Sequence, residues 1–206
     1  FMHYVLENTA REVKNLGGFK AVGQEQLRLL CDKYIEQYVK EELEDFQEKS
    51  SRFIYLFRRL KKDVYQVVED MAAELCRSDF EPLDFELDFS NAQDFSPIEL
   101  DEGDERVRLS GIADRVDGWV HDGKLYIRVV DYKTGKKKFS LSDIWYGMGL
   151  QMLLYLFALE KDGKGRYGRE IVPAGVMYIP ARNAMVSLSR TPETGEAEEK
   201  RLEEIR

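Results

Sequence analysis

Cysteine is scarce in this sequence, and long apolar segments are missing. The 206 residues include two cysteines, Cys31 and Cys76, which lie in apparently helical segments without the spacing of metal ligands. We therefore expect reduced thiols in a cytoplasmic protein rather than a disulfide framework. No apolar run approaches the roughly 20 residues of a membrane-spanning helix. The sequence also shows no secretory signal, and we therefore expect no membrane partner. It contains no internal repeat.

An excess of positive charge is also missing. Lys and Arg number 31 against 39 Asp and Glu, which gives a formal net charge of −8. This balance argues against a broadly basic nucleic-acid-binding protein, but not against a protein whose positive charge is confined to one site. The length and the 43% hydrophobic content indicate one globular domain with a sizeable core.

The most informative segment predicts a β-hairpin over residues 111–133. Asp122-Gly123 separates two alternating apolar runs, and this dipeptide favours a two-residue turn because both turn positions need positive φ. With a two-residue loop, Asp114 lies directly opposite Asp131. Since side chains alternate along a strand, Lys133 shares the face of the two carboxylates.

Two opposed carboxylates predict a metal site. Like charges directly opposite each other are destabilising, and a divalent cation such as Mg²⁺ or Mn²⁺ removes the conflict. The lysine on the same face can orient a water and stabilise negative charge at phosphorus. Asp117 falls on the other face, opposite Arg128, where we expect an ordinary salt bridge. The predicted metal ligands are Asp114, Asp131 and the backbone carbonyl of Tyr132, and the predicted catalytic residues are Asp114, Asp131 and Lys133.

The hairpin and its neighbouring segments resemble one family of nucleases. The order Gly111-x-x-Asp114, then Asp131-Tyr-Lys133, then Gln151-x-x-x-Tyr155 is similar to the core of the PD-(D/E)XK nuclease superfamily in its RecB-like branch. Within that branch, the sequence resembles the C-terminal nuclease domains of the AddB proteins of bacterial AddAB helicase–nucleases. The likeness is dense over residues 105–160 and extends more loosely to the start of the chain.

The resemblance implies roles for residues outside the hairpin. The segment Met2-His3-Tyr-Val-Leu-Glu7 is similar to the family's histidine helix, so His3 is expected to bind the metal, with Glu7 at most an outer neighbour. Otherwise His3 is a solvated terminal residue. Gln151 and Tyr155 lie on an inward helix face, where the family implies a catalytic role for Gln151 and a DNA contact for Tyr155. The alternative is a satisfied core glutamine beside a packed tyrosine.

Further charged residues surround the proposed centre. A run of three lysines follows the hairpin and is either a solvated loop or, as its position favours, a phosphate-binding segment; it consists of Lys136, Lys137 and Lys138. Base-specific recognition is not indicated, because the sequence offers no recognition helix or zinc module. Glu86 is a further acid near the site, but its strand cannot be placed in register with the hairpin.

The resemblance also implies an iron–sulfur cluster held by four cysteines near the two ends of the family's domain. Neither Cys31 nor Cys76 stands at such a position. We therefore expect the chain to be a fragment of a larger protein, without the segments that carry the cluster ligands.

The predicted fold is α/β, with a restriction-endonuclease-like mixed central sheet flanked by helices and an N-terminal helical hairpin. Helices are expected at 2–13, 24–47, 52–77 and 143–160, with Ser140 as the N-cap of the last. Strands are expected at 82–89, near 98–100, in the hairpin, to which residues 106–110 lead, and at 174–179, with a possible edge at 185–189. The aromatic residues of the two long helices are expected in the core rather than on a base-stacking platform. Residues 1–190 form one predicted domain, helical over 1–80 and sheet-based over 81–190, and 191–206 a polar tail or linker.

The predicted function is hydrolysis of DNA phosphodiester bonds with Mg²⁺ or Mn²⁺. The resemblance further implies cleavage of an unwound, single-stranded end during double-strand-break repair and recombination in a bacterial cytoplasm, beside an AddA-like helicase–nuclease subunit. Two alternatives stay open: a stand-alone RecB-like exonuclease, and a non-catalytic nuclease-like domain that holds DNA or serves as structure.

Overall fold

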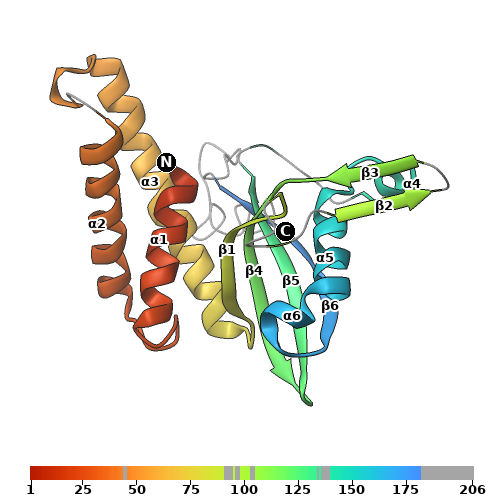
Figure 1. The fold of residues 1–206 in the computed structure, drawn as a ribbon. Coiled ribbons are helices and arrows are strands. Elements are labelled where there is room, and N and C mark those ends of the chain that lie inside the picture. Colours follow the sequence, from red (N-terminus) through yellow and green to blue (C-terminus); the bar gives the residue numbers. More distant parts are fainter. Residues whose placement is uncertain are drawn as a thin grey trace, which may run out of the picture.

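Three helices form the N-terminal part of the chain, as predicted. The computed structural model describes residues 1–43, 46–90, 95, 98–102, 105–133, 135 and 140–181. The helices are α1 (Met2–Asn15), α2 (Gln24–Glu42) and α3 (Ser51–Arg77), with a short 3₁₀ turn, η1 (Phe46–Glu48), before α3. α2 therefore ends earlier than the predicted helix 24–47. Gly17 and Gly18 end α1 at the expected break because they adopt φ values of 99° and 90°. α2 and α3 lie side by side as the expected helical hairpin (Figure 1).

The central sheet is mixed, which confirms the predicted fold class. Its strand order is β1-β4-β5-β6. β1 (Glu81–Asp88), β4 (Ile112–His121) and β5 (Lys124–Lys133) pair antiparallel, whereas β6 (Ile171–Pro180) runs parallel to β5. β2 (Ile98–Glu102) and β3 (Glu105–Leu109) form a separate two-stranded sheet that projects from one end of the molecule (Figure 1).

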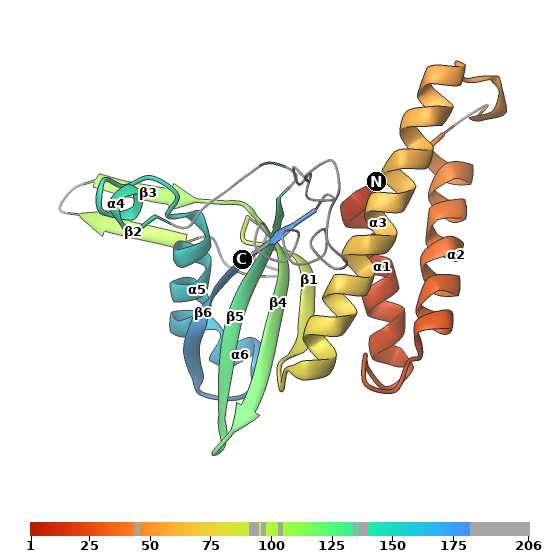
Figure 2. The same cartoon turned by 180° about the vertical axis from the view of Figure 1, so that it is seen from behind.

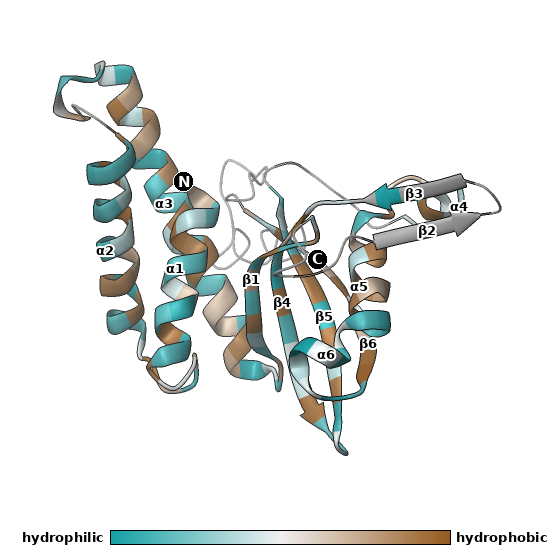
Figure 3. Cartoon of the chain, in the orientation of Figure 1, coloured by the Kyte–Doolittle hydropathy of each residue, from teal (hydrophilic) through white to brown (hydrophobic). Residues whose placement is uncertain are grey.

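Helices cover the sheet on both sides, and each side has its own core. The bundle α1–α3 lies on one side, and α5 (Gln151–Asp162) with α6 (Lys164–Tyr167) on the other (Figures 1 and 2). The first core joins the inner faces of α1–α3 to Phe85 and Tyr132 of the sheet, and the second joins α5 to residues such as Val116 and Ile127. Apolar and polar residues alternate along the strands and helices (Figure 3), as two buried interfaces require. Tyr34 and Phe57 pack against the first core, in agreement with a core role for the helical aromatics.

The hairpin has the predicted turn and register. Asp122 and Gly123 both adopt positive φ, 48° and 75°, and His121 pairs with Lys124. Pairing continues to Arg115 opposite Val130, with Asp117 opposite Arg128 as expected. The paired stretch ends there, one position short of Asp114 and Asp131.

The helix predicted over 143–160 is wrong as a single element. It is two helices, α4 (Leu141–Trp145) and α5, separated by residues 146–150. Gly147 and Gly149 adopt φ of 79° and 69°, and this left-handed conformation interrupts a helix. Ser140 does cap α4, since its hydroxyl accepts a hydrogen bond from the backbone N–H of Asp143 at 3.2 Å.

Several sequence predictions fall outside the described residues: the lysine run at 136–138, the possible strand at 185–189 and the tail at 191–206. Within the described residues, no helix is both long and apolar enough to cross a membrane.

Candidate metal centre

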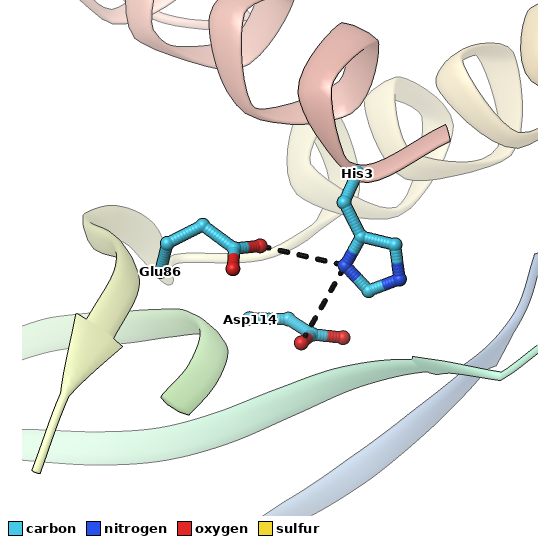
Figure 4. A group of neighbouring side chains, drawn as sticks. All are labelled: His3, Glu86 and Asp114. Atoms are coloured by element: carbon cyan, nitrogen blue, oxygen red, sulfur yellow. Dashed lines mark hydrogen bonds and ion pairs between the residues drawn. The ribbon is translucent and has the colours of Figure 1, made fainter. Parts of the chain in front are cut away.

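Three potential metal ligands converge from three separate elements. His3 lies in the first turn of α1, Glu86 on β1 and Asp114 on β4, and their side chains point toward one another (Figure 4). His3 Nδ1 is 3.4 Å from Glu86 Oε1 and 3.6 Å from Asp114 Oδ1. One ligand atom of each residue lies within 4.8 Å of the others. The predicted meeting of His3 with Asp114 therefore occurs, and Glu86 joins them.

Glu86 reaches the cluster because of the register of β1 and a local backbone irregularity. Phe85 pairs with Arg115 and Leu87 with Ala113, which places Glu86 across from Asp114. Glu86 adopts a φ of 50°, a left-handed conformation that side chains disfavour. This kink breaks the alternation of β1, so that Phe85 and Leu87 enter different cores. No turn signal ties β1 to the hairpin, and Glu86 therefore could not be placed from the sequence.

Glu7 supports the cluster from outside it. Its carboxylate forms an ion pair with Arg11, 2.8 Å away and one turn further along α1. Arg11 Nη2 in turn donates a hydrogen bond to the carbonyl of Phe85 at 3.0 Å. These contacts fix the histidine-bearing helix against the strand position that precedes Glu86.

Asp131 and Lys133 lie beside the cluster at the end of β5. Lys133 Nζ is 2.9 Å from Oδ1 and 2.7 Å from Oδ2 of Asp131. The Asp131 side chain is buried, and its Oδ2 accepts no properly oriented hydrogen bond from the described residues. The backbone N–H of Tyr132 donates to Asp114 Oδ2 at 2.7 Å, which joins the ends of the two strands where their pairing has stopped.

Mutual charge perturbs the titration of the groups in this centre. The hydrogen bond to Glu86 raises the pKa of His3 above its usual value, and the charge of Asp114 adds to the effect. Burial raises the pKa of Asp114, and the nearby charges of Asp131 and Glu86 raise it further. Burial alone would lower the pKa of Lys133, but the hydrogen bond and charge of Asp131 outweigh it, so the pKa of Lys133 is raised. The centre is therefore rich in negative charge and keeps its lysine protonated.

A buried ionic network lies beneath Tyr132. Asp117, which is fully buried, accepts hydrogen bonds from Arg115 Nε at 2.7 Å, Arg115 Nη2 at 2.9 Å and Arg128 Nε at 2.8 Å. Arg115 Nη1 donates to the Tyr132 hydroxyl at 2.6 Å, and Arg128 reaches Glu74 of α3 at 2.9 Å. The predicted Asp117–Arg128 salt bridge is present, but Asp117 joins two arginines in the core instead of forming an ordinary surface pair.

Gln151 and Tyr155 depart from their predicted positions. Gln151 is exposed at the start of α5 rather than buried, because the helix begins at this residue. Its Nε2 donates to the Tyr155 hydroxyl at 2.8 Å. The Tyr155 ring is 3% exposed and stacks on Phe89 with ring centroids 4.6 Å apart, which agrees with the alternative of a packed tyrosine. Gly111 passes so close that a Cβ on it would lie 1.9 Å from the Tyr155 hydroxyl, which explains the glycine of Gly111-x-x-Asp114.

The two cysteines take no part in the described ligand cluster. Cys31 is buried, and burial raises the pKa of its thiol to about 12. The Cys76 thiol donates to the carbonyl of Phe19. Cys31 is thus part of the first core, whereas Cys76 is exposed.

Comparison with known proteins gives one consistent result. The sequence profile of the PD-(D/E)XK nuclease superfamily matches residues 1–206. The chain is similar to the B subunit of the ATP-dependent helicase/deoxyribonuclease of Clostridium tetani, with 34% identity over 196 residues that cover 92% of this chain and 17% of the relative. It is also similar to the proteins of the same name from Ruminiclostridium cellulolyticum (35% over 202 residues; 94% of this chain, 17% of the relative) and Acetivibrio thermocellus (37% over 186 residues; 87% and 16%). The chain thus spans 16–17% of the length of these relatives.

Proposed function

The chain belongs to the PD-(D/E)XK nuclease superfamily, and from this premise we propose that it is a metal-dependent nuclease domain that hydrolyses DNA phosphodiester bonds. The observation that carries the proposal is the meeting of His3, Glu86 and Asp114 beside the Asp131–Lys133 pair. Four potential ligand side chains and a lysine at one end of a sheet contribute little to stability, and such clusters of ionisable groups are typical of functional sites.

The residues present suit a divalent cation. Carboxylate oxygens are the preferred ligands of Mg²⁺ and Mn²⁺, and imidazole is a common partner of transition metals. The buried Oδ2 of Asp131, which lacks a well-oriented hydrogen bond from the described residues, provides a further oxygen. We assign His3, Glu86, Asp114 and Asp131 as candidate ligands, together with the backbone carbonyl of Tyr132 that the sequence predicts as a donor. When bound, such a cation polarises the phosphate and makes water more acidic.

The protein's own groups would position the substrate and move charge. Lys133, held by Asp131 at 2.7–2.9 Å and kept protonated by it, can donate a hydrogen bond to the attacking water or to a phosphate oxygen. That contact would stabilise the negative charge that grows on the phosphate oxygens as water attacks in line. Asp131 and Asp114 both repel the substrate anion until positive charge is added, which makes catalysis depend on the cation.

The relatives suggest the setting in which the domain acts. Their name describes one subunit of an ATP-dependent helicase and deoxyribonuclease. We assign the chain to an AddAB-type complex with an AddA-like partner, where a helicase would deliver unwound single-stranded DNA to this centre. Location in the bacterial cytoplasm and a role in double-strand-break repair and recombination belong to the same proposal. A four-cysteine iron–sulfur cluster would need segments other than the described ones, in which the cysteines are Cys31 and Cys76.

The first test is cleavage of an end-labelled single-stranded oligonucleotide with Mg²⁺, with Mn²⁺ and with EDTA. Wild-type protein should cleave only with metal, whereas Asp131→Ala and Lys133→Ala should not cleave. A matched control is Asp143→Ala, which removes an exposed acid of α4 away from the centre. Cleavage by Asp131→Ala at the wild-type rate would refute the assignment. A folded wild-type protein that binds metal but never cleaves would favour the non-catalytic alternative.

A further inference from the structure

An uncompensated basic face covers the N-terminal half of α3. Arg52, Arg58, Arg59 and Lys62 are exposed, and none of them forms an ion pair or hydrogen bond with the part of the chain that the structure describes. At 3.6 residues per turn, these four positions and Tyr55 fall within a sector of about 120° on the helix. Four unpaired cations on one face are unusual in a chain whose net charge is −8.

The residues on the opposite side of the same helix segment pack against the rest of the protein. Phe57 packs against the Phe1 ring with centroids 5.0 Å apart, and Val64 is fully buried. Lys61, which lies outside the basic sector, is paired with Asp32 of α2 at 2.9 Å. The basic face is therefore not needed to hold α3 in place, and its charges can serve a partner.

The basic face points away from the residues of α3 that pack against the sheet, such as Met71, and its link to the metal centre runs through the start of α1. Glu74, which binds Arg128 of β5 at 2.9 Å, lies about 100° around the helix axis from the centre of the basic face. The N-terminal half of α3 extends beyond the sheet on the side where α1 begins (Figures 1 and 2). His3 of the metal centre is two residues from Phe1, which itself contacts α3.

We propose that the face formed by Arg52, Tyr55, Arg58, Arg59 and Lys62 binds the backbone of single-stranded DNA a few nucleotides away from the bond that is cut; this proposal rests on the nuclease function proposed above. From Arg52 to Lys62 the helix rises about 15 Å, which is enough to reach several phosphates. Tyr55 is 64% exposed among the cations and offers its ring to a base. Cations combined with an exposed aromatic ring are typical of sequence-independent single-strand binding, whereas an acidic protein partner would not call for the ring.

The test measures binding without cleavage. Fluorescence anisotropy with a 20-nucleotide single strand in EDTA, at several KCl concentrations, gives the affinity and its salt dependence. The test variant changes Arg52, Arg58, Arg59 and Lys62 together to glutamine, and Tyr55→Ala is made separately. A matched control changes Lys40, Lys161, Lys164 and Arg169 to glutamine, which removes the same charge from other exposed sites. Circular dichroism confirms that each variant is folded.

If all four cations contact phosphates, the slope of log K against log salt should become shallower by about 3, since each contact on a single strand contributes about 0.7. At 0.1 M KCl that slope difference amounts to a several-hundred-fold weaker affinity. The control should lose less than threefold, and Tyr55→Ala should lose roughly fivefold or more. Equal binding by the test variant and the control would overturn the proposal, and would leave an acidic protein surface as the partner to seek. Because cleavage is absent from this assay, its outcome is independent of whether the chain is a nuclease.

A second readout uses substrate length. In the cleavage assay, the four-glutamine variant should raise the KM for a 20-nucleotide strand while leaving kcat and the cleavage of a four-nucleotide strand unchanged, because the short strand does not reach α3. An equal loss on both substrates would also overturn the proposal.

Discussion

Replacing Asp117 by alanine should destabilise the domain far more than a typical substitution of a charged residue. Asp117 and Arg115 are both fully buried, and the carboxylate accepts three hydrogen bonds of 2.7–2.9 Å from two guanidinium groups. Burial disfavours the charge of Arg115, but its partners, Asp117 among them, outweigh burial and raise the pKa of this arginine above its normal value. Since an arginine in a protein does not lose its proton, removal of the carboxylate leaves a charge in the core without its main partner. The carboxylate that remains near Arg115 is that of Glu74, which is 3.8 Å away and already binds Arg128 at 2.9 Å.

The expected magnitude follows from this burial. Breaking a buried ion pair from one side costs about 3–5 kcal/mol of the free energy of unfolding, a large part of the 5–15 kcal/mol that is usual for a domain. For a chain of this size, each kcal/mol shifts the melting temperature by about 2–4 °C, so a decrease of roughly 6–20 °C is expected. Thermal unfolding followed by circular dichroism measures it. Asp143→Ala, at an exposed position of α4, is the control and should shift the transition by much less.

A double replacement separates lost charge from lost packing. In Arg115→Met combined with Asp117→Leu, no unpaired charge remains between these two positions, and much of the stability should return. At temperatures well below the transition, Asp117→Asn should still cleave DNA, because this carboxylate belongs to the network under Tyr132 and not to the metal cluster. A decrease of less than about 2 °C for Asp117→Ala would refute the view that this network is a principal support of the site.

Three further predictions concern other parts of the structure. Gly111→Ala should lower the free energy of unfolding by about 1–3 kcal/mol, because the new Cβ would meet the Tyr155 hydroxyl at 1.9 Å; Tyr155→Phe in the same chain should restore part of it in a urea titration, and no restoration would show that the clash is not with the hydroxyl. Glu86→Gly should leave the melting temperature nearly unchanged, since it relieves a positive φ, but should reduce the stabilisation by Mn²⁺; an undiminished Mn²⁺ effect would remove Glu86 from the site. Burial raises the pKa of Asp84, but hydrogen bonds from Arg166 and Tyr167 outweigh it and lower the pKa below its unfolded value of about 3.8. Asp84 therefore stabilises the fold above that pH, and the gap in melting temperature between wild type and Asp84→Asn should close as the pH falls from 7 toward 2; a constant gap would contradict the linkage.

Short sequence patterns were sufficient to predict much of the fold. The Asp122-Gly123 turn fixes both the hairpin and its register, because a two-residue loop leaves one pairing for all the residues from His121 to Arg115. The apolar period near 3.6 likewise locates the helices α2 and α3. These signals are short in range, and a single sequence contains them completely.

The sequence predictions were wrong or incomplete where the position of a residue depends on segments that are distant in the sequence. The kink at Glu86 and its register with β4 depend on contacts between strands that no turn connects, so the residue that completes the ligand cluster had no recognisable pattern. Gln151 was expected to be buried because the helix was extended back through Gly147 and Gly149, whose positive φ values place the true start of α5 at Gln151 itself. Asp117 was expected to be an ordinary partner of Arg128 because pairing across the hairpin does not reveal the layer of α3 above it.

The central claim is that His3, Glu86, Asp114 and Asp131 bind one divalent cation centre, and calorimetric titration with Mn²⁺ tests it most directly. Wild-type protein should bind Mn²⁺, and Asp114→Asn should weaken the affinity at least tenfold while the fold, followed by circular dichroism, stays intact. The hydrogen bond from the Tyr132 N–H can still reach an asparagine oxygen, which makes Asn a conservative change here. Equal Mn²⁺ affinity in the two proteins would contradict the account.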